Sequence, residues 1–155
     1  MTDTISARVR ALGLELPKTA APAANYVPFV IVPPLVFLAG QVAQFNGERP
    51  YIGKIGEALG LEDGVKAAEL CGLNLLAWIA HVVEDDAARV VRCVRLGGFV
   101  NCTAGFTEHP KVVNGASDLI VRVLGEAGRH ARTAVGSNAL PFDIAVEIDA
   151  IFEIR

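Results

Sequence analysis

The C-terminal segment, from His130 to Arg155, constrains the fold of this chain most strongly. From Ile144 onward apolar and polar residues alternate, and a period of two over this length predicts a half-buried β-strand. The apolar row consists of Ile144, Val146, Ile148, Ala150, Phe152 and Ile154. A second strand precedes it, and Pro141 lies in the turn between them. If the two strands pair as neighbours, Arg132 on the first and Glu147 on the second can reach one cleft.

The rest of the pattern predicts an α+β fold. Helices are expected over residues 4–14, 61–83 and 110–126, because apolar residues recur there at spacings of three and four. Strands are expected over 26–32, 35–41 and 89–96, and the glycines at 97–98 are expected to break the last one or to form a bulge in it. This order predicts a mixed sheet with both long helices on one face. The chain, 1–155, is expected to be one domain whose residues 1–20 add an N-terminal helix and linker.

Composition limits the partners that this chain can have. Hydrophobic residues make up 52% of the sequence, and the mean hydropathy is +0.42. Monomers rarely expose large apolar patches, so we expect part of this apolar surface to be buried between subunits. The net charge is −3 and no run of Lys or Arg occurs, which argues against a nucleic-acid partner.

The cysteine spacing and the apolar stretches of the sequence indicate the cellular compartment of the protein. Cys71, Cys93 and Cys102 show no paired spacing, which argues against a disulfide framework or a zinc site and favours a reducing cytoplasm. The stretch from Tyr26 to Phe45 is apolar, but prolines interrupt it, so it predicts a β-hairpin and not a membrane helix. No membrane association is therefore expected.

Taken alone, the candidate site residues leave two interpretations open. Arg132 is suited to grip a carboxylate through two parallel hydrogen bonds, yet a surface arginine in a salt bridge is the more ordinary role. Glu147 lies on the polar side of its strand, together with Asp149 and Glu153, and solvent exposure explains that equally well. Tyr26 is either part of a site or a core aromatic residue. The three histidines share no metal-ligand spacing.

Several motifs resemble those of the YjgF/RidA family, the reactive intermediate deaminases often labelled endoribonuclease L-PSP. The segments ARTAV at 131–135 and VEIDAI at 146–151 resemble its signature, in which an Arg-Ser/Thr pair precedes a Glu on a later strand by fifteen positions. Arg132 and Glu147 have this separation. Upstream, ANYVP at 24–28 and LAGQV at 38–42 resemble the family's G-P-Y and S-G-Q segments, and Asn114 resembles the Asn that opens its later helix. The resemblance extends from about Pro22 to the end and suggests a longer, divergent branch.

The resemblance implies a chorismate-mutase-like fold that forms a homotrimer around a central barrel, with clefts between subunits. It implies hydrolysis of 2-imino or 2-enamino acids to 2-keto acids and ammonia, without metal or cofactor. By position, Arg132 binds the carboxylate of a small substrate. Glu147 orients or activates the attacking water and passes a proton to the leaving nitrogen. The other substrate-binding positions are Tyr26, Gly40, Asn114 and Ala134, with Gly40 and Ala134 acting through their backbone.

This chain departs from the family's pattern at one of these positions, Ala134, and at Ala39 beside Gly40. Many members have Cys where Ala134 stands and Ser where Ala39 stands, so a reactive-thiol role at Ala134 is lost. Two other functions stay open at this point. One is a non-enzymatic protein that binds small carboxylic acids such as 2-keto acids, and the less favoured one is an endoribonuclease that inhibits translation.

Overall fold

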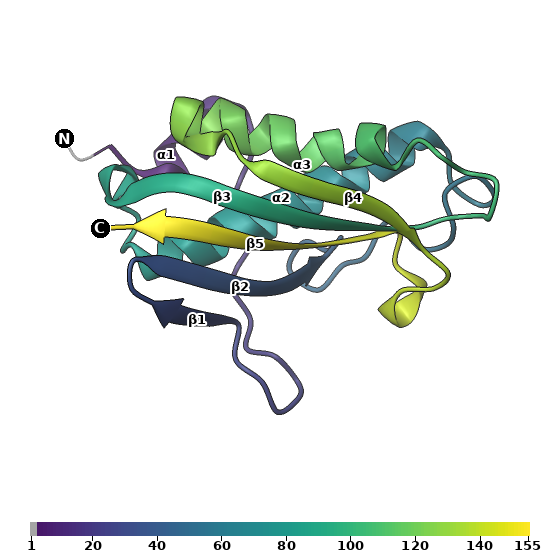
Figure 1. Ribbon diagram of the computed structural model, residues 1–155, viewed down its shortest axis with the longest axis horizontal. Coiled ribbons are helices and arrows are strands. Elements are labelled where there is room, and N and C mark those ends of the chain that lie inside the picture. The colour runs from purple at the N-terminus through teal and green to yellow at the C-terminus, as the bar shows by residue number, and fades with distance from the viewer. Residues whose placement is uncertain (1–2) are drawn as a thin grey trace.

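A five-stranded sheet with two long helices on one face makes up the computed structural model, which describes residues 3–155 (Figure 1). The helices are α1 (Ile5–Ala11), α2 (Leu61–Val82) and α3 (His109–Leu124). The strands are β1 (Phe29–Val32), β2 (Leu35–Val42), β3 (Val90–Asn101), β4 (Ala131–Ser137) and β5 (Val146–Ile154). Short 3-10 turns η1 (Ala87–Arg89), η2 (Gly125–Gly128) and η3 (Pro141–Asp143) connect them. The predicted α+β class and the placement of both long helices are confirmed.

The order of strands across the sheet corrects one prediction. The order is β1-β2-β5-β3-β4, with β3 and β4 parallel and the other pairs antiparallel. The terminal strands β4 and β5 are therefore not neighbours, because β3 lies between them. The β3-α3-β4 crossover places β4 parallel to one edge of β3, and β5 pairs antiparallel with the other edge of β3.

Strand β5 has the predicted alternation and supplies the centre of the core. Val146, Ile148, Ala150 and Phe152 are buried against the helices, whereas Glu147, Asp149 and Ile151 lie on the opposite face. Residues that pair directly across adjacent strands lie on the same face of a sheet. The residues of β2 and β3 are therefore divided between the two faces in the same way as those of β5. No helix of residues 3–155 covers the second face (Figure 1).

Helix α2 agrees closely with its predicted range, and its side chains pack between the sheet and α3. By length and composition α2 could cross a membrane, but 67% of its most apolar window is buried inside the protein, as expected for a core helix. The apolar stretch after Tyr26 forms the antiparallel pair β1–β2 around Pro33–Pro34, so the hairpin prediction is confirmed.

The glycines of β3 neither break the strand nor form a bulge in it, contrary to prediction. Strand β3 continues to Asn101, because Gly97 and Gly98 provide space for neighbours on both faces. A Cβ at Gly98 would lie 2.6 Å from a methyl group of Val113 on α3, and one at Gly97 would lie 2.5 Å from the Asp149 carboxylate. Helix α3 also ends before its predicted limit, at Leu124, where Gly125 adopts a positive φ of 63°.

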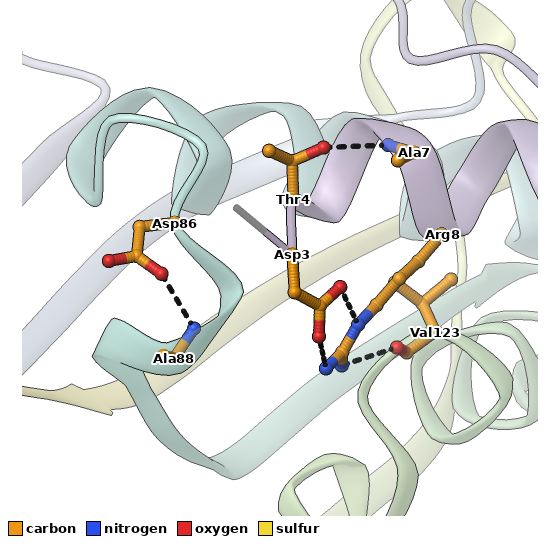
Figure 2. Close-up of polar contacts among 7 residues, drawn as sticks. All are labelled: Asp3, Thr4, Ala7, Arg8, Asp86, Ala88 and Val123. Atoms are coloured by element: carbon orange, nitrogen blue, oxygen red, sulfur yellow. Dashed lines mark hydrogen bonds and ion pairs between the residues drawn. The ribbon is translucent and has the colours of Figure 1, made fainter. Parts of the chain in front are cut away.

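The N-terminal helix is shorter than predicted and is tied to the body of the protein by polar contacts (Figure 2). The Thr4 hydroxyl accepts a hydrogen bond from the backbone N–H of Ala7 and caps the helix. The Arg8 guanidinium donates to the Asp3 carboxylate and also, at 3.0 Å, to the carbonyl of Val123 near the end of α3. Of the predicted extension 1–20, residues 1–2 lie outside the described part of the chain.

Candidate functional site

A cleft of about 380 Å³ opens where β2 ends, between the segment 20–28 and the central strand β5. Three of the residues predicted for the site line it, namely Tyr26, Gly40 and Glu147. The Trp78 side chain from α2 also contributes to its wall and is only 8% exposed. Such a concave site, whose lining combines apolar and polar groups, is typical of small-molecule binding.

Gly40 lies close against the Glu147 side chain. The pairing of β2 with β5 shifts register between Leu38 and Gln41, and this irregularity brings Gly40 beside Glu147. A Cβ on residue 40 would lie 3.0 Å from Glu147 Oε1. A larger residue at position 40 would therefore displace the carboxylate by a few tenths of an ångström.

The Glu147 carboxyl is electrostatically perturbed. Burial raises its pKa above the ordinary value of 4.5, and the neighbouring Asp149 carboxylate raises it further. Burial also raises the pKa of Asp149, although the Arg95 guanidinium, 3.6 Å away, opposes this shift. A carboxyl with a raised pKa in a cleft is a candidate for proton transfer.

Arg132 lies in a second cluster, on the edge strand β4 facing helix α3. Its guanidinium donates hydrogen bonds to Asn114 Oδ1 at 2.8 Å, to Ser117 Oγ at 3.1 Å and to the Pro110 carbonyl at 3.2 Å. The predicted residue Asn114 is therefore a direct partner of Arg132. Ala134, two residues further along β4, faces the same side and packs against the core.

His130 and Ser117 extend the Arg132 cluster, a link that no pattern in the sequence indicated. His130 Nδ1 lies 2.6 Å from the Gly128 carbonyl, so that nitrogen carries the proton. In the neutral ring, Nε2 then accepts from the Ser117 hydroxyl, 2.9 Å away. The Ser117 oxygen is thus oriented to accept from Arg132.

Within one chain, Arg132 and Glu147 do not meet, which corrects the expectation of a shared cleft. Arg132 pairs with Leu96, and Leu96 pairs with Ala150, so these three residues lie on the helix-covered face. Glu147 pairs with Phe99 and lies on the opposite face. The six predicted residues therefore form two half-sites: Tyr26, Gly40 and Glu147 at the cleft, and Arg132, Asn114 and Ala134 at the edge strand.

Two further residues of the cleft were not predicted, Arg49 and Phe142. The Arg49 guanidinium carbon lies 4.0 Å from the centre of the Phe142 ring. Both come from connecting segments with no hydrophobic period, and the Arg49-Pro50 dipeptide signals only a loop. Among residues 3–155, no group of three or more His, Cys, Asp or Glu side chains is placed to hold a metal ion.

Known proteins match this chain over nearly its whole length. Residues 6–152 match the family described as "YjgF/chorismate mutase-like, putative endoribonuclease". Protein TCP17 of Trypanosoma cruzi is 42% identical, and the match covers 97% of this chain and 94% of that protein.

Solved structures agree with this match. Atu1372 from Agrobacterium tumefaciens, a protein of unknown function, has a TM-score of 0.90 at 44% identity, covering 97% of this chain and 92% of that one. A Shewanella oneidensis protein with the same endoribonuclease description has a TM-score of 0.93 at 33% identity, covering 98% and 100%. TdcF of E. coli, at 21% identity and a TM-score of 0.62 over 100% and 98% of the two chains, shares the fold. The chain belongs to the YjgF/chorismate-mutase-like family.

Proposed function

We propose that this protein hydrolyses reactive 2-imino and 2-enamino acids to 2-keto acids and ammonia. The observation that carries this proposal is the pair of half-sites. One holds a partly buried carboxyl, Glu147, in a cleft beside Gly40, and the other holds a guanidinium, Arg132, fixed by Asn114. A carboxylate clamp and a proton-transfer group are the two elements that hydrolysis of a small imino acid requires.

The two half-sites belong to different copies of the chain in this proposal. They lie on opposite faces of one sheet, so a second copy must supply the missing half. The face without helices exposes apolar side chains, since Val30 is 51%, Phe37 40%, Phe99 38% and Val135 40% exposed. We call these four residues, together with Ile151, the uncovered face. Large exposed apolar patches mark interfaces, and we propose that three copies join through this face as a homotrimer.

In the assembled site, Arg132 of one subunit binds the substrate carboxylate through two parallel hydrogen bonds. Three donor contacts to α3 fix the guanidinium, so little conformational entropy is lost on binding. Backbone groups of Gly40 and Ala134 orient the imine nitrogen and the water, and Tyr26 closes the cleft. This positions the C2 carbon for attack.

Glu147 then acts as base and acid in turn. Its carboxylate takes a proton from the water as the oxygen bonds to C2, and the C=N double bond becomes a C–N single bond with the electrons on nitrogen. The same group returns this proton to nitrogen, which gives a tetrahedral carbinolamine with a hydroxyl and an amino group on C2. Glu147 then takes the hydroxyl proton and passes it to the amino nitrogen, the C–N bond breaks, and ammonia leaves as the carbonyl forms. A raised pKa suits this exchange because it approaches the working pH.

Decay of 2-iminopropanoate, generated by an amino-acid oxidase from alanine, tests the proposal. Wild type accelerates the decay above the buffer rate, and Arg132→Ala lowers kcat/KM by about 100-fold. Arg129→Ala is the matched control, because Arg129 is exposed and pairs only with Glu126 among the described ion pairs. No acceleration by wild type, or equal activity of Arg132→Ala, contradicts the proposal. Binding of 2-keto acids without turnover instead indicates a carboxylate-binding protein.

A further inference from the structure

The cleft contains a second guanidinium, Arg49, that is separate from the Arg132 cluster. Arg49 belongs to the loop between β2 and α2, and it lines the same cleft as Tyr26 and Glu147. Its Nε donates a long hydrogen bond of 3.4 Å to the Gln44 side chain. Its planar group also lies over the Phe142 ring, at 4.0 Å from the centroid. Both contacts restrict the guanidinium at the cleft wall.

The Phe142 ring beneath Arg49 is held there by a strained turn. Phe142 and Asp143 have positive φ values of 59° and 56°, which is uncommon for a bulky residue. The fully buried Asn101 stabilises this turn, because its Nδ2 donates to Asp143 Oδ1 at 2.9 Å and to the Ile144 carbonyl at 3.1 Å. Lys54 Nζ donates in turn to Asn101 Oδ1 at 2.9 Å. A costly conformation held by a buried network at a cleft indicates a functional role for the ring that it presents.

The charge of Arg49 has no acidic partner within the described chain. Five ion pairs join residues of the range 3–155, and Arg49 takes part in none of them. The charged neighbour that shifts the pKa of Glu147, the carboxyl of the same cleft, is Asp149. The guanidinium is therefore available to a ligand, and its fork of donors matches a carboxylate.

We infer that Arg49 binds a second acid group of the substrate, so that the preferred substrates are imines of amino dicarboxylic acids. The inference rests on the proposed function, in which Arg132 takes the carboxylate next to the imine carbon. The second carboxylate, at the far end of the side chain, then pairs with Arg49 on the opposite wall. A cleft of about 380 Å³ accommodates a four- or five-carbon diacid. Stacking on Phe142 leaves the edge of the guanidinium free for this contact.

Calorimetric binding of two product-like acids tests the inference. The five-carbon 2-ketoglutarate carries the second carboxylate, and 2-ketobutyrate lacks it. Wild type binds 2-ketoglutarate about tenfold more tightly or better. In Arg49→Gln the ratio of the two Kd values falls to about one. Arg122→Gln, at an exposed position on α3, is the matched control and keeps the wild-type ratio. Melting temperatures measured in the same buffer verify that all variants are folded.

The outcomes separate this inference from the proposed function. Wild type that binds 2-ketobutyrate through Arg132, but binds 2-ketoglutarate no more tightly, overturns the second acid site alone. A preference for 2-ketoglutarate that survives in Arg49→Gln overturns it as well. Wild type that binds neither acid overturns both the second acid site and the proposed function. Turnover of imines generated from glutamate and from alanine provides the same comparison as a ratio of kcat/KM values.

Discussion

At the residue scale, the ionisation of Glu147 controls the proposed reaction. The carboxylate form accepts the proton from water, and burial together with Asp149 raises its pKa above 4.5. Because the pKa is raised, protonation begins at a higher pH than for an ordinary glutamate. We therefore expect kcat/KM to fall as the pH decreases, with a midpoint above 4.5. Glu147→Gln lowers kcat/KM by about 100-fold and abolishes this acidic limb.

A pH series of initial rates, each corrected for the buffer rate, measures the limb in wild type and in the variant. A midpoint at or below 4.5, or an unchanged limb in Glu147→Gln, contradicts the assignment of Glu147.

Gly40 offers a second prediction at this scale. In Gly40→Ala the added methyl group lies 3.0 Å from Glu147 Oε1, so the carboxylate must shift by a few tenths of an ångström. We expect kcat/KM to fall about tenfold or more, with little change in stability, because the carboxylate is the flexible end of its side chain. Gly105→Ala is the matched control, since nothing lies within 4 Å of a Cβ at that position. Equal activities of the two variants would show that the close approach has no catalytic role.

The residues of the site were predictable from the sequence to different degrees. Arg132 and Asn114 were predicted separately and lie 2.8 Å apart, and Gly40 and Glu147 were predicted separately and are in contact. Arg49 and Phe142 were not predicted, because neither lies on a strand or helix whose period reveals its direction. The conformation that brings them together depends on Asn101, which is distant in sequence from both.

At the scale of elements, the contact between β3 and α3 depends on Gly98. A methyl group there would lie 2.6 Å from Val113 Cγ2, which forces the helix away from the sheet. Gly98→Ala is expected to lower the free energy of unfolding by about 1–3 kcal/mol. Adding the substitution Val113→Ala to the Gly98→Ala chain removes the clash and should recover part of the lost stability. The effects of the two substitutions on the free energy of unfolding are therefore expected to be non-additive.

Urea denaturation of the two single variants and the double variant measures this coupling. Strictly additive losses would show that Gly98 and Val113 do not limit the approach of α3.

Most of the elements were predictable, but their neighbours were not. Periodicity located α2 and β5 closely, because each buries one continuous apolar row. The short connection through Pro141 suggested a hairpin of β4 and β5. However, a connection of that length also allows the chain to pass over the end of β3, and β5 pairs with the edge of β3 that lies opposite β4. Sequence patterns specify which face of a strand is buried and do not specify which strand lies beside it.

At the scale of the whole molecule, the uncovered face holds the assembly together in the proposed function. A charge introduced there must be buried or the contact must open. Phe99→Glu is therefore expected to convert a trimer into monomers, and activity is lost with it. Light scattering measures the mass, and Arg122→Glu, on the exposed side of α3, is the control that keeps the trimer. A wild type that is monomeric and active contradicts the shared site.

The central claim is that one copy of the chain supplies Arg132 and another supplies Glu147. Subunit mixing tests it most directly. Arg132→Ala and Glu147→Gln are each nearly inactive as homotrimers, and the two proteins are refolded together in equal amounts. Every mixed trimer then has one interface with both native residues, so random mixing restores about a quarter of the wild-type activity. If trimers that mass spectrometry shows to be mixed stay as inactive as the parent variants, the shared site is contradicted.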